Sequence, residues 1–125
     1  MDSEYQNSKL KLVIIPDAGS NDVNECTRLK DKGINTIVLD HHLCDVSNPD
    51  AIVINNQLSD YPNKELSGVG IVWQFCRYID KLLNISNADN SLDIVALGNC
   101  ADMMSMSSIE TKHIINKGFH QVKNP

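Results

Sequence analysis

Three metal-binding side chains stand in a row at residues 40–42, within the stretch VLDHHLCD. Asp40, His41 and His42 directly follow an apolar run, and a second aspartate, Asp17, follows an earlier apolar run. Carboxylate oxygens suit hard divalent cations such as Mg²⁺, and imidazole shifts the preference toward Mn²⁺ or another transition metal. Two such ions held about 4 Å apart can activate a water and stabilise an in-line phosphoryl displacement. These residue types therefore predict metal-dependent phosphoryl chemistry.

An alternation of strand and helix patterns positions these residues. The apolar run at residues 10–15, closed by Pro16, predicts a strand buried on both faces. A helix over VNECTRLKDKG, ended by Gly33, leads to a second buried strand, INTIVLD. Strand, helix and strand over about 30 residues predict a βαβ unit with parallel strands. Ligands of such sheets bind outside the carboxyl ends of the strands, so Asp17 and the Asp-His-His triplet are expected to line one crevice.

The next elements continue this pattern. Residues 51–57 predict a short third strand, and residues 70–83 predict a helix with Trp73 in the core or at its boundary. Residues 108–118 predict a closing helix.

An apolar stretch, SLDIVALG, lies between these two helices and is expected to break at Gly98 before it reaches Asp102. We therefore predict an α/β fold with a mainly parallel sheet and flanking helices. Residues 10–125 are expected to form one domain after a polar lead-in at residues 1–9.

Composition narrows the classes of function. The chain has 125 residues and a formal net charge of -5, so a broad basic face for nucleic acid is not expected. The four cysteines contain no C-x-x-C pair, which argues against a structural zinc site and predicts free thiols in a reducing cytosol. No signal peptide or run of 18 apolar residues is present, which predicts a cytoplasmic chain without a membrane partner.

Each candidate residue also has a structural explanation when it is taken alone. An aspartate after a strand often forms a turn or caps a helix, and a histidine pair often packs at the surface. Their shared position at one sheet edge is what favours a functional site. At that edge a protonated His42 could donate from both ring nitrogens to a phosphate oxygen.

Several motifs in order resemble the DHH phosphoesterase family. VLDHH resembles its signature, IIPDAG its second motif, and ALGNCAD at residues 96–102 its fourth motif, A-L-G-x-x-A-D. LSGVGIVWQF at residues 66–75 resembles the segment that opens a helix in the RecJ-type exonuclease branch, and HIINKGF resembles the segment after the fourth motif. The resemblance covers about residues 10–120.

The resemblance implies a site for two Mn²⁺ or Mg²⁺ ions in the complete domain. Asp17 matches the aspartate that bridges the ions, and His41 and Asp102 match ligands of the second ion. Asp40 matches a residue that is either a ligand or the orienting partner of a histidine.

The resemblance also implies substrate contacts. His42 matches the histidine that touches the scissile phosphate. Gly68 and Gly70 match small residues that let the backbone approach the substrate or a neighbouring strand; an ordinary helix entry explains them equally well.

The function implied is the core of a metal-dependent phosphodiesterase, most similar to a RecJ-like 5′→3′ exonuclease that hydrolyses single-stranded DNA with metal-activated water. The family's first motif, an Asp-x-Asp pair, and its C-terminal substrate-binding domain have no match here. We therefore expect a fragment that binds one ion weakly, hydrolyses little or nothing alone, exposes a sheet edge or apolar face, and needs the missing remainder of the enzyme.

Two alternatives stay open at this point. The same chemistry could act on short oligonucleotides, cyclic dinucleotides or pyrophosphate, which the acidic charge mildly favours over long DNA. The chain could also be a non-catalytic binding or assembly module that keeps the fold.

Overall fold

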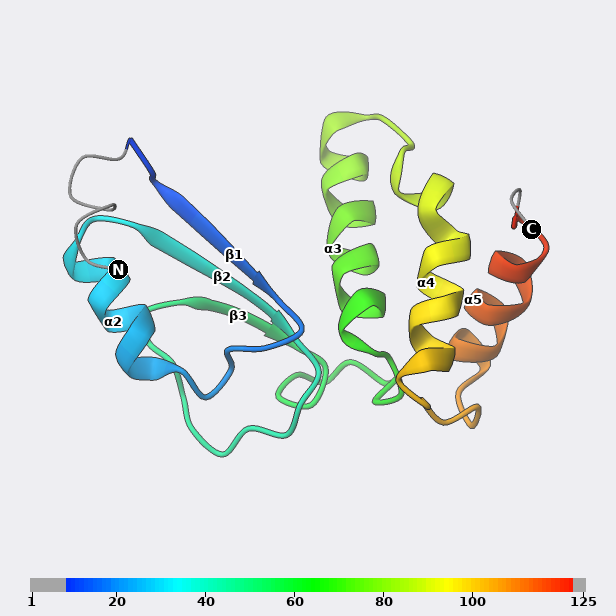
Figure 1. Cartoon of the computed structure of the whole chain (residues 1–125), viewed down its shortest axis with the longest axis horizontal. Helices are drawn as coiled ribbons and strands as arrows, with labels where there is room; N and C mark the ends of the chain where they lie inside the picture. The colour runs from blue at the N-terminus through cyan, green and yellow to red at the C-terminus, as the bar shows by residue number, and fades with distance from the viewer. Residues whose placement is uncertain (1–8, 123–125) are drawn as a thin grey trace.

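A three-stranded sheet forms one half of the molecule. The structure, a computed structural model, describes residues 9–122, so most of the predicted lead-in lies outside the described residues. Strands β1 (Leu12–Pro16), β2 (Asn35–Asp40) and β3 (Ile52–Asn55) lie in the order β1-β2-β3 and pair in parallel (Figure 1). The predicted α/β fold with a parallel sheet is confirmed.

Helix α2 (Val23–Asp31) connects β1 to β2 and packs on one face of the sheet. Its Cys26 is fully buried, as is Val38 of β2. The strand–helix–strand order and the parallel pairing of β1 with β2 match the predicted βαβ unit.

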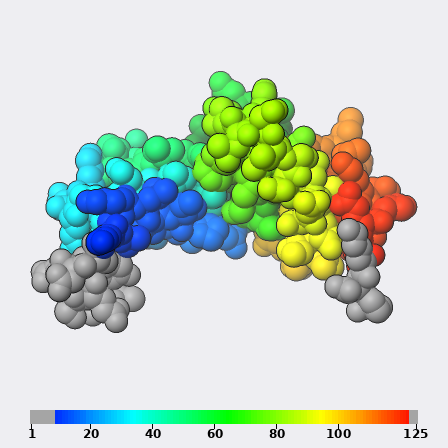
Figure 2. Space-filling model, turned by 90° about the horizontal axis from the view of Figure 1, so that it is seen from above, coloured from blue at the N-terminus to red at the C-terminus, as the bar shows by residue number. Residues whose placement is uncertain are grey.

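The other half of the molecule is helical. It contains α3 (Gly68–Leu83), a short 3₁₀ helix η1 (Ala88–Ser91), α4 (Leu92–Ala101) and α5 (Ile109–Phe119). Figure 1 shows α3 next to the sheet, with α4 and α5 beyond it, and Figure 2 shows the two halves side by side along an elongated molecule.

The main core joins the two halves. Leu39 of β2 packs with buried side chains of the helical half, which are Leu66, Ile71, Trp73, Leu92, Val95 and Ile114. Trp73 is therefore a core residue, as predicted. Because Leu39 directly precedes Asp40, the last residue of β2, this core fixes the sheet edge that carries the Asp-His-His triplet.

The prediction that β1 is buried on both faces is wrong. Leu12 and Ile14 are 44% and 47% exposed, and Ile52 of β3 is 62% exposed. These side chains share one face of the sheet, because Ile14, Ile37 and Ile52 are register partners and side chains alternate along a strand. α3 covers that face mainly near Leu39, so the rest of this apolar face is exposed, as expected.

The helix boundaries also differ from the prediction. α3 begins at Gly68, two residues earlier than expected, and α5 continues through Gly118 to Phe119. α4 runs unbroken through Gly98 to Ala101, so the predicted break at Gly98 is wrong. A Cβ on Gly98 would overlap Val69 of α3, so the glycine allows close helix packing rather than ending the helix.

All four cysteines lie in the described part of the chain and are free, as predicted. No helix among the described residues is long and apolar enough to cross a membrane.

Candidate metal centre

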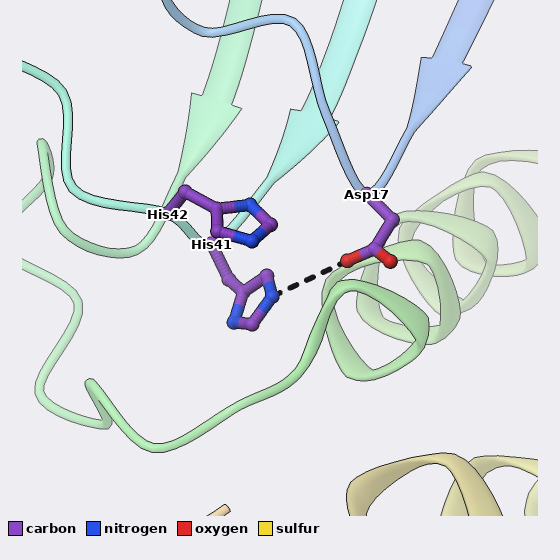
Figure 3. A group of neighbouring side chains, drawn as sticks. All are labelled: Asp17, His41 and His42. Atoms are coloured by element: carbon purple, nitrogen blue, oxygen red, sulfur yellow. Dashed lines mark ion pairs between the residues drawn. The ribbon is translucent and has the colours of Figure 1, made fainter. Parts of the chain in front are cut away.

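Asp17 lies immediately after β1, at the carboxyl edge of the sheet. Its backbone N–H donates to the carbonyl of Leu39, which continues the pairing of β1 with β2 by one step. Its φ of 62° is in the left-handed region, which aspartate tolerates better than most residues. The turn thus directs the carboxylate toward the end of β2 (Figure 3).

His41 stands between two carboxylates. Its Nε2 atom lies 3.2 Å from Oδ1 of Asp17 and 3.4 Å from Oδ2 of Asp102. The same nitrogen is buried and has no hydrogen bond of acceptable geometry. The two carboxylate oxygens therefore lie close to Nε2 of His41 without forming a hydrogen bond with it.

Asp102 reaches this point from the helical half, at the end of α4. It caps the C-terminus of α4, and its N–H donates to the carbonyl of Gly98. The next residue, Met103, has a φ of 53° and turns the chain away. The site is thus assembled across the junction between the sheet and the helices.

Asp40 is turned away from this cluster and is almost fully buried. Its Oδ1 accepts hydrogen bonds from the backbone N–H groups of His41 and His42 and lies 2.7 Å from Nδ1 of His42. Its Oδ2 accepts the N–H of Ser20. These contacts hold the ring of His42 and the backbone of the following loop against Asp40.

The Asp40–His42 contact changes the protonation of both side chains. Burial acts to raise the pKa of Asp40, but hydrogen bonds from His42 and Ser20 outweigh it and hold that pKa far below its ordinary value. The hydrogen bond with Asp40 raises the pKa of His42, against a smaller opposing effect of burial. Since Nδ1 is engaged with Asp40, Nε2 of His42 is the ring nitrogen left for a ligand.

Asn55, which supports the loops at this edge, was missed by the sequence reasoning. The side-chain Nδ2 of Asn55, at the end of β3, donates to Oγ of Ser20 and to the carbonyl of His42, both at 2.9 Å. Asn55 thereby ties the loop after β1 to the loop after β2. Polar residues at the end of the third strand were the available signal, but nothing local indicated these partners.

The two glycines at the start of α3 have different surroundings. A Cβ on Gly68 would lie 2.5 Å from Cγ and 2.7 Å from Cβ of Asp17, so only glycine lets α3 approach this aspartate so closely. Gly68 also lines a hollow of about 350 Å³ together with Asp17 and Asp102. Gly70 instead packs internally, against Leu66 and Asn99.

The donor set fits a divalent cation. Ligand atoms of Asp17, His41 and His42 all lie within 4.8 Å of one another, and Figure 3 shows the three side chains around one space. Adjacent ligands of an octahedral ion at about 2.1 Å are about 3 Å apart, close to the distances around Nε2 of His41. A cation bound here would give that buried nitrogen, which has no hydrogen bond, a partner.

Comparison with known proteins gives the family. The model of the DHH family, N-terminal domain, matches residues 2–99. The chain belongs to the DHH family. The matched span includes Asp17 and the Asp-His-His triplet and ends before Asp102.

Curated relatives within the DHH family are much longer than this chain. The SPbeta prophage protein YorK of Bacillus subtilis (strain 168) is 45% identical over 115 residues, which cover 91% of this chain and 20% of YorK. The single-stranded-DNA-specific exonuclease RecJ of Haemophilus influenzae is 32% identical over 109 residues, 78% of this chain and 19% of RecJ. The chain thus spans about a fifth of the length of these relatives.

Solved structures agree with the fold. The crystal structure of exonuclease RecJ bound to manganese superposes with a TM-score of 0.81 at 20% identity, over 96% of this chain and 32% of that one. RecJ from Thermus thermophilus, in complex with Mn²⁺, gives a TM-score of 0.77 at 21% identity, over 94% of this chain and 18% of that one.

Proposed function

We propose that this chain carries part of the metal site of a RecJ-type exonuclease that hydrolyses single-stranded DNA. The observation that supports the proposal most strongly is Nε2 of His41, buried without a hydrogen bond between the carboxylates of Asp17 and Asp102. The relatives that match the chain include several single-stranded-DNA-specific exonucleases, and two structural neighbours hold manganese.

Asp17, His41 and Asp102 are the residues that would hold a divalent cation, Mn²⁺ or Mg²⁺. When bound, such an ion supplies Lewis-acid stabilisation of a phosphoryl oxygen and lowers the pKa of a coordinated water. Asp17 is the candidate for a ligand shared with a second ion, because its side chain is 64% exposed and one oxygen remains free of His41. Asp40 supports the site indirectly by orienting His42.

His42 is the candidate contact to the scissile phosphate. Asp40 accepts from Nδ1 and raises the pKa of the imidazole, which increases the fraction of His42 that is protonated and can donate from Nε2. The ring of His42 lies 4.4 Å from that of His41 between centroids, so a phosphate that meets His42 also lies next to the metal ligands.

Binding of the DNA strand is proposed to depend on a part of the enzyme other than these 125 residues. The chain has 16 acidic and 11 basic residues, whereas binding of a phosphate backbone draws on lysine and arginine. The chain covers only 20% of YorK and 19% of RecJ, which leaves room for such a surface. We therefore propose that the isolated chain binds metal weakly and has little nuclease activity.

Calorimetric titration with Mn²⁺ tests the proposal on the chain itself. The wild type should show saturable binding, and Asp17→Asn and His41→Ala should each abolish it, because each removes a ligand. His113→Ala serves as the control, since His113 is an exposed histidine on α5 and should leave binding unchanged. Binding that survives both ligand substitutions would overturn the assignment of the site.

A substrate assay then tests the reaction. YorK with its own segment exchanged for these 125 residues should degrade single-stranded DNA in Mn²⁺ and lose activity with His42→Ala. A chimera that cleaves only dinucleotides would favour the short-oligonucleotide alternative. A folded, metal-binding chimera without hydrolysis of either substrate would favour a binding module.

A further inference from the structure

A completely buried side-chain amide connects the two helices that flank the candidate metal centre. Asn99 lies on α4 with 0% exposure. Its Oδ1 accepts the backbone N–H of Ser67, just before α3, at 3.2 Å, and its Nδ2 donates to the carbonyl of Val95 at 2.8 Å. Both ends of the amide are therefore satisfied, and one of them spans from α4 to α3.

The hydrogen bond between Asn99 and Ser67 holds the segment of the chain that contacts Asp17. Ser67 is the residue before Gly68, and Gly68 is the position at which α3 touches the side chain of Asp17. Ser67 is almost fully buried, yet its hydroxyl makes no hydrogen bond and does not cap α3. The start of α3 is thus tied to α4 through the Ser67 N–H and the amide of Asn99.

The backbone of Asn99 stabilises the turn that contains Asp102. Its carbonyl accepts the N–H of Met104 at 3.1 Å, and this bond closes the turn after α4 that displays Asp102. The left-handed Met103 lies inside that turn. A single residue therefore contacts the two chain segments that position the carboxylates on either side of His41.

We propose that Asn99 is a positioning residue of the metal centre, which sets the spacing between Asp17 and Asp102 by accepting a hydrogen bond from the backbone N–H of Ser67. The inference rests on the proposed metal site but concerns a residue that touches neither metal nor substrate. The A-L-G-x-x-A-D pattern leaves position 99 open, so the family resemblance does not imply this role. An apolar side chain there would leave the buried N–H of Ser67 unpaired and weaken the tie.

Asn99→Ala is the direct test, with Asn63→Ala as the matched control. Asn63 is also a buried amide, and its Nδ2 donates to Glu110 and Thr111 of α5 rather than to the segments that carry Asp17 and Asp102. Both substitutions should lower the urea midpoint of unfolding, because both delete buried hydrogen bonds. Only Asn99→Ala should weaken Mn²⁺ binding, by about 10-fold or more, as for other residues that orient metal ligands.

Amide hydrogen exchange without metal provides the second readout. In Asn99→Ala the amides of both Ser67 and Asp102 should exchange faster than in the wild type, whereas Asn63→Ala should leave both unchanged. Wild-type Mn²⁺ affinity in a folded Asn99→Ala chain would overturn the inference and leave the proposed function intact. If the wild type binds no Mn²⁺, the proposed function fails. Independently of metal binding, an unchanged exchange rate of the Asp102 amide in Asn99→Ala would overturn the inference about Asn99.

Discussion

Replacing Gly68 by alanine separates metal binding from folding at the point where α3 meets Asp17. The new Cβ would lie 2.5 Å from Cγ and 2.7 Å from Cβ of Asp17, whereas real Cβ contacts are not shorter than 3.0 Å. Rotation about the Cα–Cβ bond of Asp17 moves its carboxylate but leaves its own Cβ in place. The backbone of Asp17 or of α3 must therefore move as well.

The size of that movement decides the effect on the metal. Relief of the contact with Cβ of Asp17 requires at least 3.0 − 2.7 = 0.3 Å, and relief of the contact with Cγ requires 3.0 − 2.5 = 0.5 Å. Ligand distances in metal sites hold to within about 0.2 Å. We therefore expect Gly68→Ala to weaken Mn²⁺ binding by about 10- to 100-fold, as seen when ligand-orienting residues are changed.

Folding should respond differently. Alanine favours a helix over glycine by up to about 1 kcal/mol, which offsets part of an overlap that costs about 1–3 kcal/mol, so the free energy of unfolding should fall by at most about 2 kcal/mol. Gly68→Ala is compared with Asp17→Gly and with the double variant by Mn²⁺ calorimetry and urea unfolding. Glycine adopts the left-handed conformation of residue 17 and removes the overlapping side chain.

The double variant supplies the control. In the Asp17→Gly background, which lacks the ligand and should bind no Mn²⁺, Gly68→Ala should stabilise the chain, because the overlap is gone. Gly68→Ala with wild-type Mn²⁺ affinity would refute the reasoning, since Asp17 would then tolerate displacement or would not be a ligand.

Three further substitutions test the supporting structure. Because the pKa of Asp40 is lowered in the folded chain, its ionised form stabilises the fold above the ordinary carboxyl pKa of about 3.9, and this stabilisation declines below that pH. In urea unfolding, Asp40→Asn should therefore lower the free energy of unfolding most at pH 7 and less at pH 3. A loss that is the same at both pH values would contradict the assignment. Asn55→Ala removes three side-chain hydrogen bonds, two of which join the loops, and should lower the free energy of unfolding by about 1–3 kcal/mol in urea titrations. An unchanged free energy of unfolding would argue against the tie between the loops. The new side chain in Gly118→Ala would overlap Leu92 and Ala96, so it should destabilise the α4–α5 pair by about 1–3 kcal/mol. The Mn²⁺ affinity per folded chain should stay at the wild-type value. An altered affinity would show that α5 also positions the metal ligands.

The sequence predicted the sheet side of the site because chain order alone constrains it. A βαβ unit makes consecutive strands parallel, so Asp17 and the Asp-His-His triplet had to meet at one edge. The exposure of β1 was not predictable in the same way. An apolar run has the same pattern whether or not another element covers it, and here α3 covers only part of that face.

The helical side of the site was harder to predict. Gly98 was interpreted as a break because glycine is unfavourable within helices, but its close approach to Val69 outweighs that cost. Asp102 therefore arrives at the end of a helix. The contacts of Asn55 and Asn99 join residues 35 and 32 positions apart, and no local pattern encodes such pairings.

The left-handed conformation of Asp17 has a consequence for how this site changes over generations. Aspartate, asparagine and glycine are the residues that adopt this backbone most readily, so drift at position 17 is channelled toward substitutions that spare the turn. Asparagine and glycine codons are each one base transition away from those of aspartate. A single base change can therefore remove the proposed metal ligand while the fold is preserved. Related proteins that keep the fold but not the chemistry are expected to carry Asn or Gly at position 17.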